Sequence, residues 1–83
     1  MVKELTQEEK HRVLVILSDL SVFTIEYLSE NTHKKLGDLG MSSLDRLELL
    51  VDVEKAFSIS LENYPFMHDS TIEDIFTSIT LKL

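Results

Sequence analysis

Three segments of the chain begin with a hydroxyl residue that is followed, three positions later, by an acidic residue and by apolar residues at helical spacing. In such a capping box the hydroxyl accepts a hydrogen bond from a first-turn amide, and the carboxylate accepts one in return. These patterns predict helices over about residues 7–20 and 44–57, and a last helix that opens at Ser70 or Thr71. The pairs are Thr6 with Glu9, Ser42 with Asp45, Ser70 with Glu73, and Thr71 with Asp74.

The two connections between these helices are less regular. Residues 21–36 contain apolar side chains without clean periodicity, and the polar stretch after them is closed by Gly37 and Gly40, the two glycines of the chain. We predict a long loop here that can include a helical turn, with a short strand over residues 22–28 as the alternative. Residues 58–70 leave room for a short helix around their Asn and Pro. The expected fold is therefore all-α: a small four-helix bundle of three long helices plus a short third helix, with a long loop between helices 1 and 2.

Size and composition limit the kind of protein this is. With 83 residues, of which 43% are hydrophobic, we expect residues 1–83 to form one small domain. The absence of cysteine excludes disulfides, thiolate metal sites and a cysteine nucleophile. We expect no metal site, because the three histidines are widely spaced; they are His11, His33 and His68.

The formal charge of −7 is unevenly distributed, since residues 37–83 hold nine acidic and three basic side chains. Such a surface repels nucleic acid and anionic lipid, and it attracts basic patches on proteins. No apolar run approaches the roughly 18 to 20 residues that cross a bilayer, and the charged N-terminus lacks an apolar signal core. We therefore expect a cytoplasmic monomer that binds neither nucleic acid nor membrane.

The helix predicted over residues 44–57 has three distinct stripes on a helical wheel. One broad apolar face should pack on the core, and it consists of Leu49, Leu50, Val53, Ala56 and Phe57. An acidic stripe on the opposite side consists of Asp45, Glu48 and Asp52, and an apolar flank consists of Leu44, Leu47 and Val51. Two interpretations remain open at this point. The acids can be a solvated face and the flank a wider core, or both can bind a partner with a basic, apolar groove.

The two adjacent serines at the start of this helix have different predicted roles. Ser42 is expected to be the N-cap, which leaves Ser43 exposed as the first helical residue on a glycine-flanked turn. An anion attached to Ser43 would meet free amides and the helix dipole, worth roughly 0.3 to 1 kcal/mol. We do not expect Ser43 to be a catalytic nucleophile, because the segment lacks the closing glycine of a nucleophile elbow.

These residues resemble the acyl carrier proteins, whose landmark is Asp-Ser-Leu at the start of the second helix of a four-helix bundle. The matching segments here are Asp38-Leu39-Gly40, Ser42-Ser43-Leu44-Asp45, Glu48-Leu49 and Glu54, and the similarity runs without gaps from about Leu36 to Ile79. The resemblance implies that Ser43 receives 4'-phosphopantetheine from coenzyme A through a separate transferase. The arm would then carry an acyl group as a thioester for fatty-acid, lipid or polyketide-type synthesis, and the protein itself would not be an enzyme.

The same resemblance implies a docking helix for the transferase and for synthases or acyl-transferring enzymes with basic patches. Its residues would be Leu44, Asp45, Leu47, Glu48, Val51, Asp52 and Glu54. Two departures indicate a specialised carrier. Ser42 replaces the family's aspartate, and Lys34 and Lys35 replace a serine and an apolar anchor, for which Leu36 would substitute. The alternative is an unmodified acidic helical module that has the carrier fold and binds proteins through this helix.

Overall fold

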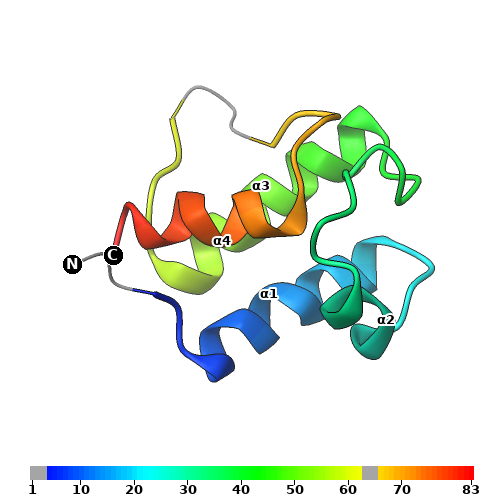
Figure 1. Ribbon diagram of the computed structural model, residues 1–83. Helices are drawn as coiled ribbons and strands as arrows, with labels where there is room; N and C mark the ends of the chain where they lie inside the picture. Colours follow the sequence, from blue (N-terminus) through cyan, green and yellow to red (C-terminus); the bar gives the residue numbers. More distant parts are fainter. Residues whose placement is uncertain (1–3, 63–65) are drawn as a thin grey trace.

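Four helices form the regular structure of the chain in the computed structural model, which describes residues 4–62 and 66–83. They are α1 (Gln7–Leu20), α2 (Ile25–Glu30), α3 (Ser43–Phe57) and α4 (Ile72–Thr80). Figure 1 shows the three longer helices lying alongside one another, with the short α2 at one end of α1. Among the described residues no strand occurs. One isolated antiparallel β-bridge joins Lys35 and Thr71. The predicted all-α fold with four helices is confirmed.

Three of the helices begin at the predicted capping boxes. In each, the N-cap hydroxyl accepts from the backbone amide three residues later, and that residue's carboxylate accepts from the N-cap amide. The pairs are Thr6 with Glu9, Ser42 with Asp45 and Thr71 with Asp74. Of the two possible starts for the last helix, Thr71 is therefore the cap.

The short helix lies in the segment after α1, where a loop that can include a helical turn was predicted, and not between the last two long helices. It is the second helix, Ile25–Glu30, within the segment expected to be mainly loop, and it rules out a strand over residues 22–28. Thr24 begins it by accepting a hydrogen bond from the Tyr27 amide at 3.1 Å. In the segment where a short third helix was expected, residues 58–62 and 66–70 contain no helix, and residues 63–65 lie outside the described part.

One hydrophobic core joins all four helices. The helical side chains buried in it are Val13, Leu14, Leu17, Leu28, Leu49, Leu50, Val53, Phe57, Ile72, Ile75 and Ile79. The connections add Leu5, Leu36, Leu39, Met41, Leu61 and Phe66. Ala56, which was predicted for the core, lies partly buried at its edge, as do Ile16, Leu20 and Phe76. Leu36 is fully buried, as expected for an anchor of the loop, and burial of such a side chain contributes about 1.5–3 kcal/mol.

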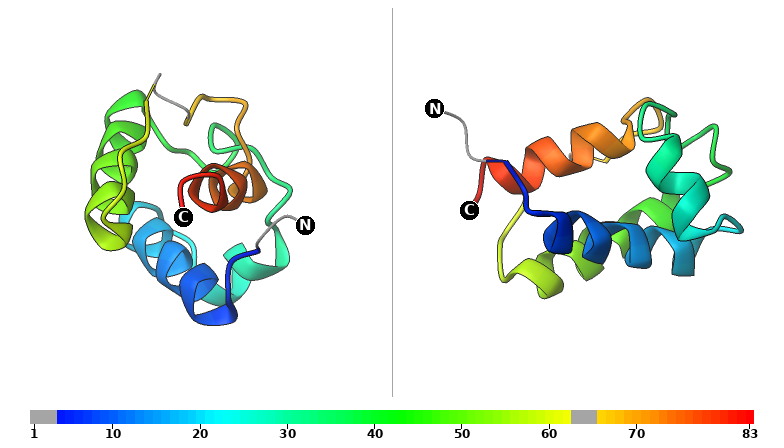
Figure 2. Two further views of the ribbon diagram at one scale, coloured as in Figure 1. Left: turned by 90° about the vertical axis from the view of Figure 1, so that its left-hand side faces the viewer. Right: turned by 60° about the horizontal axis from the view of Figure 1, so that its bottom comes forward.

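The loop before α3 is bound to the segment before α4. The Leu36 amide donates to the Ser70 carbonyl at 2.8 Å, and the Gly37 amide donates to the His68 carbonyl at 3.0 Å. Figure 2 shows these two segments side by side at one end of the bundle. Backbone hydrogen bonds between segments more than 30 residues apart thus fix the position from which α3 starts.

Candidate functional site

Ser43 is the first residue of α3, and it is exposed. The hydroxyl of Ser42 accepts a hydrogen bond from the Asp45 amide at 3.2 Å, and the Ser42 amide donates to the Asp45 carboxylate at 2.9 Å. The predicted division between a capping serine and a first helical serine is confirmed. Because capping uses the side chain of Ser42, a group attached to Ser43 would leave the capping box intact.

The turn that leads into α3 is built by backbone hydrogen bonds around Leu36. The Leu36 carbonyl accepts from the amides of Leu39 and Met41 at 3.1 and 3.2 Å, and the Gly37 carbonyl accepts from the Gly40 amide at 3.1 Å. Gly40 adopts φ 78°, a left-handed conformation that side chains with a Cβ rarely take. The turn therefore requires glycine at position 40, two residues before Ser42.

Gly37 lies in close contact with the side chain of His68. The imidazole ring of His68 occupies the space into which a Cβ at position 37 would project. Gly37 does not have a positive φ, so close contact rather than backbone conformation explains this glycine. Both glycines of the chain thus belong to the turn that presents Ser43.

The apolar flank of α3 faces solvent. Leu44, Leu47 and Val51 are 75%, 45% and 39% exposed. The interpretation that these side chains only widen the core is therefore wrong. Large exposed apolar side chains beside one another on a helix are typical of a protein-binding surface.

The acidic residues of α3 differ in what their carboxylates contact. Asp45 is engaged in the capping box, and Glu54 accepts a hydrogen bond from the Leu61 amide at 2.7 Å. In the described part of the chain, Glu48 and Asp52 make no ion pair or side-chain hydrogen bond. Their charges are therefore available to a partner.

Comparison with known proteins identifies the family. The family described as a phosphopantetheine attachment site matches residues 22–79. A protein named acyl carrier protein from Aster yellows witches'-broom phytoplasma (strain AYWB) is 35% identical over 66 residues, or 80% of this chain and 84% of that protein. The chain belongs to the acyl carrier proteins. Proteins of this family are carriers rather than enzymes, and the matched family description gives a covalently attached phosphopantetheine group as the cofactor.

Two further acyl carrier proteins match a shorter part of the chain. That of Onion yellows phytoplasma (strain OY-M) is 44% identical over 43 residues, which are 52% of this chain and 57% of the relative. That of Phytoplasma australiense is 39% identical over 46 residues, which are 55% of this chain and 60% of the relative. The chain thus spans less than two thirds of these two relatives. No solved structure matches this carrier protein significantly.

Arg46 is a residue near the site that the sequence analysis did not single out. It lies three residues after Ser43 on α3, so the two side chains share a face of the helix. Its Nη1 donates to the Met41 carbonyl at 3.4 Å, which brings the guanidinium back toward the start of the helix. Its Nε is buried without a hydrogen-bond partner. The signal in the sequence is a basic residue at helical spacing from Ser43.

The residues at the start of α3 fit a phosphate-linked arm. The amides of a first helical turn and the positive end of the helix dipole favour an anion at this position. The guanidinium of Arg46 retains an unused donor one turn away. The exposed hydroxyl provides the attachment point, and the helix N-terminus and a basic side chain provide the donors that a phosphodiester needs.

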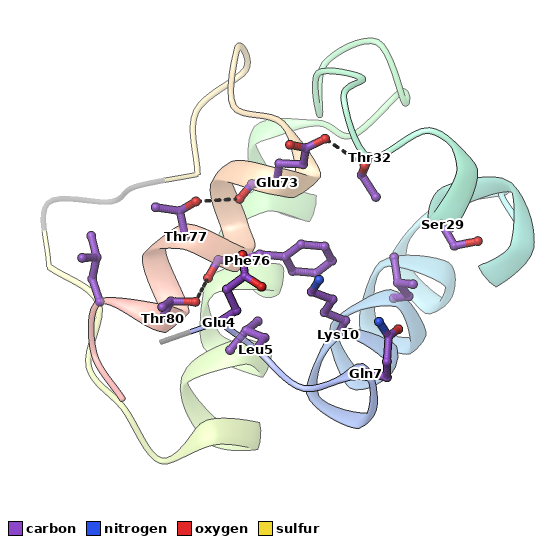
Figure 3. A pocket seen from close by; sticks show the side chains of 12 residues that line it. Glu4, Leu5, Gln7, Lys10, Ser29, Thr32, Glu73, Phe76, Thr77 and Thr80 are labelled. Carbon is purple, nitrogen blue, oxygen red and sulfur yellow. Dashed lines mark hydrogen bonds between the residues drawn. The ribbon is translucent and has the colours of Figure 1, made fainter. Parts of the chain in front are cut away.

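A pocket of about 570 Å³ opens between the start of α1, α2 and α4, away from α3 (Figure 3). None of the predicted site residues lines it; those that do include Leu5, Lys10, Leu14, Thr32, Glu73 and Phe76. Within residues 4–62 and 66–83, no cluster of three metal-ligating side chains occurs. Over the same residues, no helix has the length and apolar character to span a membrane.

Proposed function

We propose that Ser43 carries the phosphopantetheine arm and that the protein presents acyl groups, bound as thioesters, to enzymes of fatty-acid, lipid or polyketide-type synthesis. The observation that carries this proposal is the exposed Ser43 at the first position of α3, beside a serine whose hydroxyl is already used as the cap. Its place three residues after Gly40 of the Asp38-Leu39-Gly40 turn agrees with the family's attachment motif.

The chemistry at Ser43 would be the transfer of one phosphoryl-linked group. The Ser43 oxygen attacks the phosphorus that bears the pantetheine portion of coenzyme A, and the pyrophosphate bond breaks. Adenosine 3',5'-bisphosphate leaves, and the hydroxyl proton passes to a base of the transferase. When bound, the arm supplies a thiol that forms a thioester with the acyl group.

We further propose that α3 is the docking helix for the transferase and for the enzymes that load or use the acyl group. Its exposed apolar flank, Leu44, Leu47 and Val51, supports this role. The unpaired carboxylates of Glu48 and Asp52 would meet basic patches on these partners. Ser42 in place of the family's aspartate removes one negative charge beside the arm, which favours a specialised set of partner enzymes. We place this function in the cytoplasm.

Intact mass spectrometry tests the attachment. The purified protein is incubated with coenzyme A, magnesium and a permissive transferase, and we expect a gain equal to one phosphopantetheine group. Ser43→Ala should prevent the gain. Ser42→Asp is the matched control, because aspartate keeps an N-cap and should still allow modification.

The same experiment also tests the alternative hypothesis, an unmodified module that binds proteins through α3. Absence of the mass gain, or a gain that persists in Ser43→Ala, would contradict Ser43 as the attachment residue. An unmodified module would instead keep its partner binding in Ser43→Ala and lose it when Asp45 and Glu48 are both changed to lysine.

A further inference from the structure

We propose that the Arg46 guanidinium binds the phosphodiester at the base of the arm, so that Arg46 is a positioning residue for the cofactor. This inference rests on the proposed attachment of the arm to Ser43. It goes further by assigning a specific contact within this chain to the phosphate.

The position of Arg46 permits this contact. Side chains on a helix lean toward its N-terminus, and residues three apart lie about 5–6 Å from each other at Cβ. The 3.4 Å approach of Nη1 to the Met41 carbonyl shows that the guanidinium reaches back past the level of Ser43. A phosphate on the Ser43 oxygen would therefore lie within reach of the same group.

The hydrogen bonding of Arg46 is incomplete in the unmodified chain. Its bond to Met41 is long for an N–H donor, and the buried Nε has no acceptor at all. Among the described residues, the salt bridges join Lys35 and His68 to Asp69, and none includes Arg46. Of the five N–H donors of a guanidinium, Nη1 is therefore weakly bonded to Met41, and Nε has no partner within the described part of the chain.

A phosphodiester would supply the missing acceptors. A modest rotation of the Arg46 side chain exchanges the weak bond to Met41 for charge-assisted bonds from Nε and a terminal nitrogen to two phosphate oxygens. The fork of arginine suits such a two-oxygen contact better than the point charge of lysine. The cation also offsets the repulsion that Asp45 and Glu48, on the same helix, exert on the phosphate.

The direct test is the ¹H–¹⁵N spectrum of the arginine Nε groups before and after conversion by coenzyme A and a transferase. The chain has two arginines, Arg12 and Arg46, so the spectrum contains its own reference. Arg12 lies on α1, where its Nη1 donates to the Ala56 carbonyl at 3.1 Å. We expect the Arg46 signal to shift on conversion and the Arg12 signal to stay in place.

Variants provide a second measurement on the same samples. We compare the ³¹P chemical shift of the modified wild-type protein with that of two modified variants. The shift in Arg46→Gln should differ from that of the wild type, and the shift in Arg46→Lys should lie closer to it. Arg12→Gln is the matched control, and its ³¹P resonance should equal that of the wild type.

The two proposals can fail separately. Complete conversion by mass with an unmoved Arg46 signal, or with the same ³¹P resonance in wild type and Arg46→Gln, would overturn the role of Arg46 and leave the attachment to Ser43 standing. No conversion by mass would overturn both.

Discussion

The carboxylate of Glu54 accepts a hydrogen bond from the backbone amide of Leu61 at 2.7 Å, across the turn that ends α3. The Glu54 carbonyl accepts a second bond from the Ile59 amide at 3.1 Å. Leu61 itself is buried in the core. Glu54, which the family resemblance suggests as a docking acid, therefore also holds the chain that leaves α3.

Removal of the Glu54 carboxylate should lower the stability of the fold. We expect Glu54→Ala to reduce the free energy of unfolding by about 1–3 kcal/mol, because a partly buried amide loses a charged acceptor. The matched variant Glu48→Ala, on the exposed face of the same helix, should change it by less than about 0.5 kcal/mol. Urea unfolding measures both. Equal effects would contradict a structural role for Glu54.

The two adjacent serines should differ in how much stability the fold loses when each is changed to alanine. Ser42→Ala removes the N-cap and should cost about 1 kcal/mol in thermal or urea unfolding. Ser43→Ala should stay within about 0.5 kcal/mol of the wild type, because alanine suits the first position of a helix. A loss of stability in Ser43→Ala as large as that in Ser42→Ala would contradict this division.

Gly37 and His68 should be energetically coupled. Gly37→Ala places a methyl group where the His68 ring lies, and we expect it to destabilise the wild-type protein by about 1 kcal/mol. In a His68→Ala background the same change should stabilise by about 0.4–1 kcal/mol, because alanine lowers the entropy of the unfolded chain. A double-mutant cycle by urea unfolding measures the sign change. If Gly37→Ala changes the free energy of unfolding in the same direction in both backgrounds, the His68 ring is not the cause of the destabilisation.

Glu48, which is exposed, and Asp52, which is half-buried, should control the rate of phosphopantetheine loading. We expect the combined change Glu48→Lys and Asp52→Lys to slow phosphopantetheine transfer by about tenfold or more at low salt, because it reverses the charge presented to a basic partner. The difference should shrink as salt screens the charges. Initial rates of mass conversion at several salt concentrations measure it. The control variant combines Asp19→Lys on α1 with Glu26→Lys on α2, which changes the net charge by the same amount. A similar slowing in this control would show that the net charge, and not the α3 surface, determines the rate.

Features that depend on neighbours in sequence were predictable. The hydroxyl and carboxylate of each capping box lie three residues apart, so local chemistry marked the starts of α1, α3 and α4. The same short-range pattern predicted Ser42 as the N-cap and Ser43 as the first helical residue. The apolar spacing of α3 also identified the face that packs on the core, and Leu49, Leu50, Val53 and Phe57 are buried there.

Features that depend on distant contacts were not predictable from the sequence. The six residues of α2 are too few to be stable alone, and one of them, Leu28, is fully buried. Ser18, on α1, holds the chain entering α2 by donating to the Phe23 carbonyl at 2.9 Å. The contact of Arg46 with Met41 and the contact of His68 with Gly37 likewise require the folded backbone.

The capping of α3 by Ser42 has a consequence for the order of events in the life of the protein. The capping box at the N-terminus of the helix is formed by Ser42 and Asp45 and does not include the hydroxyl that is to be modified. A newly made chain can therefore fold first and meet the transferase as a finished surface, so that maturation is a reaction on a native protein.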